Sequence, residues 1–294
     1  MPALPVPSGP SARDPCRDRA ALRYDSNMTA PPPPIGAGAR SAWPVRALRY
    51  GYRIPLLLAH LLVGLPLVLL LTLRPARRLR VHGERFDYRV IRAWQGGLMR
   101  IFGFRVRQTG TPLPGAALFV ANHVSWIDIS TLHSQRMMGF VAKREIAHWP
   151  LVGWLAIRGE SIFHARGSSE SMGGVLHEML ARLRGGHSVG VFPEGRTRDG
   201  REVGPFHARI FLAAVEAGVP VQPVALRYGT RGAAQADVAF GPDENFMQNF
   251  LRLLGDPPRV AEVHFLEAIP PATESARRRI AELARQRIVD AMAG

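Results

Sequence analysis

The sequence predicts an α/β domain in which helices cover a mixed sheet, preceded by a membrane-anchoring helical segment. From residue 104 onward, short apolar runs alternate with longer stretches of helical periodicity, a pattern typical of layered α/β domains. Upstream, residues 54–73 form a Leu-rich run of 20 residues without Asp, Glu, Lys or Arg, which is long enough for a membrane helix. We therefore expect a tail over residues 1–44, a membrane anchor over 45–84 and a folded domain over 85–294.

The composition excludes several classes of protein. With 47% hydrophobic and 21% charged residues, the 294-residue chain is not disordered throughout. Its net charge of +15 implies attraction to a polyanion, either nucleic acid or an anionic membrane surface. Lys143 is the single lysine, so the abundance of arginine reflects gene base composition more than chemistry. Cys16 is the single cysteine, which excludes a disulfide framework and a cysteine zinc site.

The tail is predicted to be disordered. Residues 1–44 are rich in Pro, Gly, Ala and Arg and have no apolar periodicity. Met1 and Met28 could each serve as the start of the protein.

The anchor is predicted from length and flanking charge. At a rise of about 1.5 Å per residue, residues 54–73 span roughly 30 Å, the thickness of the hydrocarbon core. Arginines flank the run on both sides, so charge gives no orientation. Pro55 is acceptable at the start of a helix, whereas Gly64 and Pro66 are expected to weaken or kink the middle. A crossing helix and a helix hairpin dipping into one leaflet both remain open.

The folded domain is expected to contain strands and helices in alternation. A basic amphipathic helix over 85–102 suits either the membrane interface or ordinary packing on the domain. The predicted strands are 104–108, 117–121, 140–143, 161–163, 188–192, 221–227 and 261–265, and the further helices are 171–184, 206–217 and 274–292.

A histidine and an aspartate follow the second predicted strand. His123 is placed at the carboxyl end of this strand, where α/β proteins position ligands and catalytic groups. Residues five apart on one regular helix point about 140° apart, so His123 can meet Asp128 only from a loop, with Asp128 in the first turn of a helix. The carboxylate would then fix the tautomer of the imidazole and stabilise its protonated form. Capping by Asn122 and Ser125, with an incidental histidine, is the alternative.

Two further motifs follow strand-like runs. Glu194 and Gly195 belong to a Pro-Glu-Gly turn after 188–192, and Arg196 and Arg198 beside it could bind a phosphate. Residues 186–190 match the G-x-S-x-G pattern of serine hydrolases, but Ser188 precedes its strand instead of following it, which argues against a nucleophile there.

Four blocks in order resemble the glycerolipid acyltransferase family, over about residues 85 to 230. The blocks are Asn122-His123-x4-Asp128, Phe163-x2-Arg166, Phe192-Pro193-Glu194-Gly195 and Val219-Pro220-Val221-Gln222-Pro223-Val224. The resemblance implies that His123 is the general base and Asp128 its partner. It further implies that Arg166, Glu194 and Gly195 shape the acceptor site, with Arg196 or Arg198 binding the charged head group.

The resemblance also implies the substrates. The acyl donor is expected to be acyl-CoA or acyl carrier protein, with no other cofactor and no metal, because a thiolate is a good leaving group. The favoured acceptor is 1-acyl-glycerol-3-phosphate, giving phosphatidic acid. His207 stands where the family commonly has a lysine, so lyso-ornithine lipid or another lysolipid is the alternative acceptor.

The expected location is the inner membrane of the cell, with the catalytic domain facing the cytoplasm, where acyl thioesters are made. Membrane lipids are therefore expected partners and nucleic acid is not. A non-catalytic basic protein that binds membranes or nucleic acid is the alternative of another class.

Overall fold

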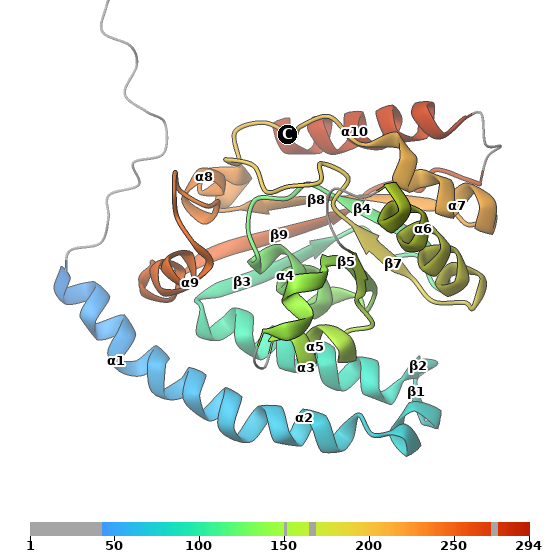
Figure 1. Cartoon of the computed structure of the whole chain (residues 1–294). Helices are drawn as coiled ribbons and strands as arrows, with labels where there is room; N and C mark the ends of the chain where they lie inside the picture. The colour runs from blue at the N-terminus through green and yellow to red at the C-terminus, as the bar shows by residue number, and fades with distance from the viewer. Residues whose placement is uncertain (1–42, 150–151, 165–168, 272–275) are drawn as a thin grey trace, which may run out of the picture. The chain divides into compact units, whose positions relative to one another are not determined.

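Helices cover both faces of a seven-stranded sheet in the computed structural model of the chain (Figure 1). The structure describes residues 43–149, 152–164, 169–271 and 276–294. In chain order, the strands are β3 (Phe104–Thr109), β4 (Leu118–Ala121), β5 (Gly139–Lys143), β6 (Ile162–His164), β7 (Val189–Val191), β8 (Val221–Tyr228) and β9 (Arg259–Phe265). Each predicted strand is present, with small differences at its ends.

The sheet is mixed, as predicted. Its spatial order is β3-β9-β8-β4-β7-β5-β6. Strands β8, β4, β7, β5 and β6 run parallel to one another, whereas β9 and its parallel neighbour β3 run the other way. The carboxyl ends of the parallel strands therefore meet at one edge, which is the usual position of a functional site in such a sheet.

The helices complete the layers on either side. They are α3 (Phe86–Ile101), α4 (Ile127–Gln135), α5 (Val152–Arg158), α6 (Ser169–Arg184), α7 (Leu212–Ala217), α8 (Gln235–Val238), α9 (Phe246–Gly255) and α10 (Arg277–Ala293). The helices predicted over 85–102, 171–184 and 274–292 are confirmed as α3, α6 and α10. The one predicted over 206–217 is a short 3-10 turn followed by α7. Helices α5, α8 and α9 have no counterpart among the predicted elements.

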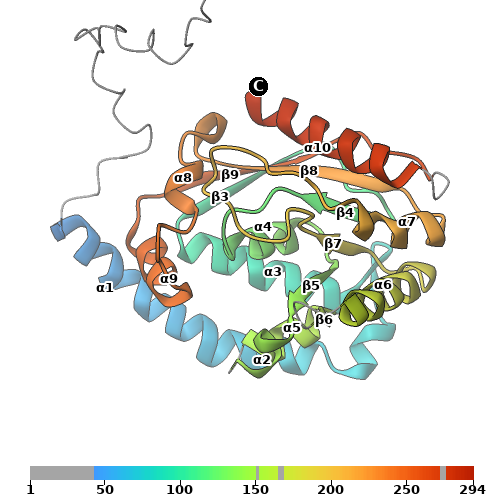
Figure 2. The same ribbon diagram turned by 45° about the horizontal axis from the view of Figure 1, so that its top comes forward.

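The core lies on both faces of the central strands, because successive side chains of a strand point to opposite faces. Leu118 and Val120 of β4 pack with α6, α7 and α10. Phe119 and Ala121 of the same strand pack on the other face with Leu132 of α4, and α3 lies against α4. Figure 2 shows the sheet between these two helical layers. Every residue of β4, β7 and β8 is buried.

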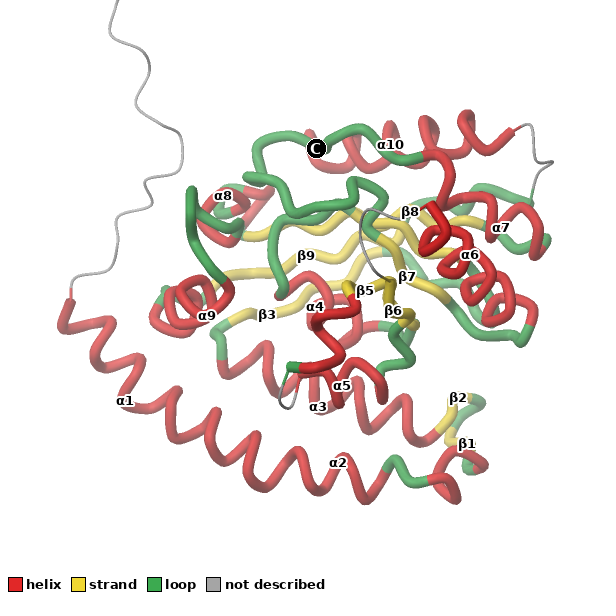
Figure 3. The backbone as a smooth tube through the Cα atoms, in the orientation of Figure 1, coloured by secondary structure: helices red, strands yellow, loops and turns green. Residues whose placement is uncertain are grey.

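The apolar run near the N-terminus is part of a longer helix than predicted. Helix α1 (Trp43–Ala59) continues through a wider turn of π geometry (His60–Gly64) into α2 (Leu65–Leu71), as Figure 3 shows. By length and composition this 29-residue helix could cross a membrane. Pro55, expected in a first turn, lies inside α1. The weakening predicted near Gly64 corresponds to the wider turn, which ends at this residue, and the helix continues beyond it. A small hairpin, β1 (Arg80–Val81) with β2 (Glu84–Arg85), joins it to α3.

One side of this helix packs on the domain and the other is exposed. Leu57 is buried with residues of α3 and α9, and Leu65 and Val68 are buried with others of α3. On the opposite side, Leu62 is 73% and Leu48 is 71% exposed. The predicted anchor and the folded domain therefore share core contacts between Leu57 and Val68.

Candidate active site

The loop after β4 brings a histidine and a carboxylate together at the carboxyl edge of the sheet. His123 follows this strand, and Asp128 lies in the first turn of α4. Nδ1 of His123 is 2.8 Å from Oδ2 of Asp128. Because an ionised carboxylate only accepts hydrogen bonds, Nδ1 donates to it, and Nε2 of the neutral imidazole is the basic nitrogen. This is the loop-to-helix arrangement that the spacing requires.

The Asp128 carboxylate is completely buried and held by several donors. Oδ2 also accepts from the backbone N–H groups of Val124 at 2.7 Å and Ser125 at 3.0 Å. Oδ1 accepts from the hydroxyl of Tyr228 at 2.6 Å. Burial and the Asp128 charge raise the pKa of Tyr228 well above its usual value, so this hydroxyl remains a donor. The orientation of Asp128 is thus fixed independently of His123.

Tyr228 was not among the predicted site residues. It ends β8, the strand beside β4, and so reaches the same edge of the sheet. A tyrosine at the carboxyl end of a long buried strand was the signal that could have identified it.

Glu194 fixes the backbone of the histidine. The side chain is almost wholly buried, and Oε1 accepts from the backbone N–H of His123 at 2.9 Å. Oε2 accepts from the backbone N–H of Gly204 at 2.8 Å and lies 3.4 Å from Nε of Arg198. Burial raises the pKa of Glu194, against the effect of these hydrogen bonds. Both oxygens are thus engaged inside the protein, so the geometry favours positioning of His123 over direct contact with a substrate.

A stack of aromatic rings sets the plane of the imidazole. The His123 ring lies on Phe192 with centroids 3.9 Å apart and planes 13° apart. Phe192 in turn lies on Phe140, at 5.3 Å and 9°. Gly190 leaves room for this stack, because an added Cβ would lie 2.6 Å from Cε1 of Phe140.

A pocket of about 370 Å³ opens beside His123. Its walls carry both signs of charge. The guanidinium of Arg285, from α10, is engaged by the carbonyl groups of Val203 and Gly204, whereas Arg201 and Glu202 are exposed. The lining includes Asn122, His123, Val124, Glu194, Arg198, Gly200, Arg201, Glu202, Val203, Gln235, Arg285, Val289, Met292 and Ala293.

The remaining predicted site residues lie in different places. Gly195 adopts a φ of +71° in the turn after β7, a conformation that favours glycine. Arg196 is exposed on this turn and does not line the pocket, whereas Arg198 does. Arg166 falls within residues 165–168, outside the described residues.

Ser188 does not form a nucleophilic site. It precedes β7, at the opposite edge of the sheet from His123, and its hydroxyl donates to the carbonyl oxygen of Gly115 at 2.7 Å. Within the described ranges, no three His, Cys, Asp or Glu side chains are grouped so that they could hold a metal ion.

A histidine paired with a buried carboxylate beside a pocket, at the carboxyl edge of an α/β sheet, is the arrangement expected of an enzyme that uses a general base. The family described as Acyltransferase matches residues 104–227. A lyso-ornithine lipid O-acyltransferase from Pseudomonas aeruginosa is 38% identical over 199 residues, covering 67% of this chain and 75% of that protein. The chain belongs to the acyltransferase family, and it is an O-acyltransferase.

The chain is also similar to a second named acyltransferase and to one solved structure. A 1-acyl-sn-glycerol-3-phosphate acyltransferase from Neisseria gonorrhoeae is 35% identical over 140 residues, covering 47% of this chain and 55% of that protein. The crystal structure of the 1-acyl-sn-glycerophosphate acyltransferase from Thermotoga maritima shares the fold, with a TM-score of 0.61 at 20% identity, covering 84% of this chain and 98% of that chain. Membership of the acyltransferase family excludes the alternative of a non-catalytic basic protein.

Proposed function

We propose that this enzyme transfers an acyl chain from acyl-CoA or acyl carrier protein to the free hydroxyl of a lysolipid, with His123 as the general base. The main support is the pairing of His123 with Asp128 beside the pocket, because it leaves Nε2 as the basic nitrogen. Histidine titrates near neutral pH, which suits proton transfer to and from a hydroxyl.

The proposed reaction needs one base and one carboxylate. Nε2 of His123 takes the proton of the acceptor hydroxyl while the oxygen attacks the thioester carbonyl carbon. The buried charge of Asp128 stabilises the imidazolium, and Glu194 and Phe192 hold the ring in place. The carbon–sulfur bond then breaks, and the imidazolium returns the proton to the departing thiolate. The products are an ester and a free thiol.

We further propose lyso-ornithine lipid as the acceptor. The relative that acylates this lipid matches the chain over 199 residues, against 140 for the Neisseria enzyme. The mixed charge of the pocket also fits a head group with a carboxylate and an amine, because exposed Arg201 and Glu202 could pair with one each. The phosphate of 1-acyl-glycerol-3-phosphate, favoured from the sequence, remains the second candidate because Arg196 is exposed at the turn beside Glu194.

Competition between acceptors tests the choice. Purified enzyme receives equal concentrations of lyso-ornithine lipid and 1-acyl-glycerol-3-phosphate, once with acyl-CoA and once with acyl carrier protein. We expect kcat/KM to favour the ornithine lipid by at least about 10-fold, corresponding to roughly 1.4 kcal/mol in transition-state binding. A tenfold preference for the phosphate would reverse the acceptor assignment and leave the roles of His123 and Asp128 unchanged.

We propose that the N-terminal helix lies along one membrane leaflet, on the cytoplasmic side of the inner membrane. The buried side chain of Arg53, near the middle of the helix, donates to the carbonyl groups of Leu254 and Asp256 in the domain, each at 2.8 Å. Together with the buried side chains of Leu57, Leu65 and Val68, this contact holds the helix against the domain. Its exposed face, including Leu48, Leu62 and Leu70, is then available to acyl chains.

Washing of membranes tests the anchoring. The wild-type protein should stay in the membrane fraction through high salt and carbonate, because apolar burial is not screened by ions. Replacing Leu62 and Leu70 together by lysine should move most of the protein into the soluble fraction, while Tm changes little, because both side chains are exposed. Release of the wild type by salt alone would show that the anchoring is electrostatic.

A further inference from the structure

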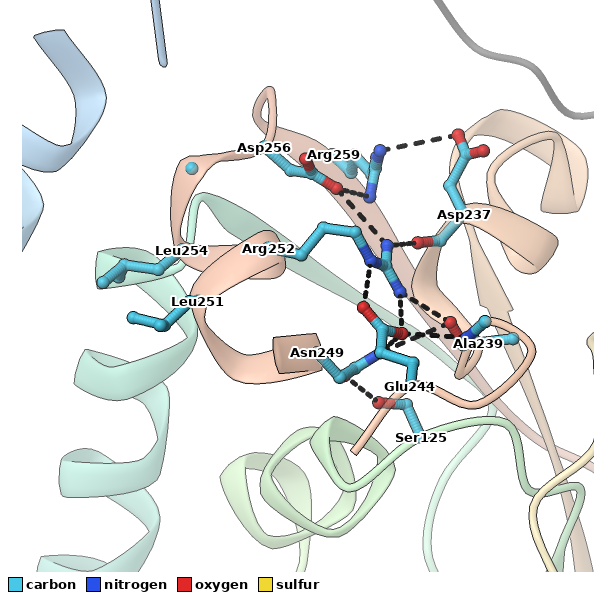
Figure 4. Close-up of polar contacts among 12 residues, drawn as sticks. Ser125, Asp237, Ala239, Glu244, Asn249, Leu251, Arg252, Leu254, Asp256 and Arg259 are labelled. Carbon is cyan, nitrogen blue, oxygen red and sulfur yellow. Dashed lines mark hydrogen bonds and ion pairs between the residues drawn. The ribbon is translucent and has the colours of Figure 1, made fainter. Parts of the chain in front are cut away.

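Asn249 of α9 is a buried amide that contacts the catalytic loop. Its side chain is completely inaccessible. Oδ1 accepts two hydrogen bonds at 3.1 Å, from the hydroxyl of Ser125 and from the indole N–H of Trp126. Figure 4 shows the side chain between Ser125 and Glu244. Because Ser125 and Trp126 lie between His123 and Asp128 in the chain, Asn249 holds the loop that joins this pair.

A fixed carboxylate sets the orientation of the Asn249 amide. Nδ2 donates to Oε2 of Glu244 at 2.9 Å. Arg252 clamps Glu244 with two hydrogen bonds, at 2.7 Å to Oε1 and 2.8 Å to Oε2. Burial acts to raise the pKa of Glu244, but these bonds and those from Gly241 and Asn249 lower it to about 2. The ionised carboxylate therefore draws Nδ2 toward itself, and Oδ1 faces the loop.

Helix α9 is itself a rigid support. Its first turn is closed by a capping box between Asn245 and Gln248. At the other end, Arg53 of α1 binds the carbonyl group of Leu254, and the hydroxyl of Tyr50 donates to the carbonyl group of Leu251 at 2.8 Å. Figures 1 and 2 both show α9 beside α1. A group on such a support can hold a catalytic loop to within a fraction of an ångström.

We propose that Asn249 is a positioning residue for acyl transfer, which acts through Ser125 and Trp126 to hold His123 against the acceptor hydroxyl. The proposal rests on the function proposed above for His123. Ser125 connects Asn249 to the catalytic pair directly, because its side chain donates to Asn249 and its backbone N–H donates to Asp128. Asn249 lies outside the residues matched by the family, 104–227. A small displacement of the base lowers the rate of proton transfer without weakening substrate binding.

A double-mutant cycle tests this role in the full-length enzyme. Asn249→Ala should lower kcat by about 10-fold or more, while KM for the acceptor and donor changes by less than about threefold. Ser125→Ala should have a smaller effect, and the double variant should resemble Asn249→Ala, because both changes remove one shared contact. Met247→Ala is the matched control: this side chain lies in the same first turn of α9 and is 57% exposed, so its removal should leave kcat per folded molecule unchanged.

If Asn249→Ala does not fold, a second test exchanges the amide of Asn249 and the carboxylate of Glu244 between the two positions. Asn249→Asp alone places two carboxylates together and should lower kcat. Adding Glu244→Gln to Asn249→Asp again places one amide opposite one carboxylate. The double variant should have a kcat at least about threefold higher than that of Asn249→Asp alone. A wild-type kcat for folded Asn249→Ala, multiplicative effects in the cycle, or no recovery in the exchanged variant would each overturn the role of Asn249. His123→Ala, measured alongside, separates the outcomes, because an active His123→Ala would refute the proposed function itself.

Discussion

Replacing His123 by alanine is expected to lower kcat at least ~100-fold, the usual scale for a positioned general base. The fold should survive, because the imidazole is partly exposed and its carboxylate partner keeps three other donors. Acyl transfer is measured on purified protein, with Tm as the check on folding. Ser188→Ala should retain most activity, since this hydroxyl lies at the opposite edge of the sheet. If Ser188→Ala were inactive and His123→Ala active, the proposed mechanism would be wrong, and a serine nucleophile of the hydrolase type would take its place.

Replacing Asp128 by asparagine is expected to cost a comparable ~100-fold or more in kcat. An amide oxygen can still accept from Val124 and Ser125, so the loop should keep its shape. What is lost is the buried negative charge that stabilises the imidazolium. The same assay measures the effect.

Tyr228→Phe is the matched control for the charge of Asp128. It removes the hydrogen bond to Oδ1 and leaves the carboxylate. A smaller loss is expected than for Asp128→Asn. A Tyr228→Phe variant as inactive as Asp128→Asn would mean that geometry, and not charge, dominates the contribution of this carboxylate.

Local patterns predicted the sheet and the pairing of His123 with Asp128 for a physical reason. Buried parallel strands are apolar throughout, so β4 and β7 stand out in the sequence. The five-residue spacing of His123 and Asp128 can be satisfied only by a loop entering a helix, and the structure has that geometry.

Contacts between distant segments could not be predicted in the same way. Asn249 and Ser125 are 124 positions apart, and Arg53 and Leu254 are 201 apart, so no local pattern joins them. Helix α9 did have a readable start, because Asn245 and Gln248 have the spacing of a capping box. The apolar run at 54–73 indicated a membrane segment, but its docking on the domain depends on α3 and α9, which are distant in sequence.

The most direct measurement of the central claim counts both products of one reaction. Purified enzyme is incubated with lyso-ornithine lipid and an acyl thioester, and the free thiol and the diacylated lipid are quantified together. We expect equal amounts of the two, formed only when the acceptor is present, and neither from His123→Ala. Thiol released without acylated lipid, or acylated lipid formed at the wild-type rate by His123→Ala, would contradict the assignment of this site as a histidine-dependent acyltransferase.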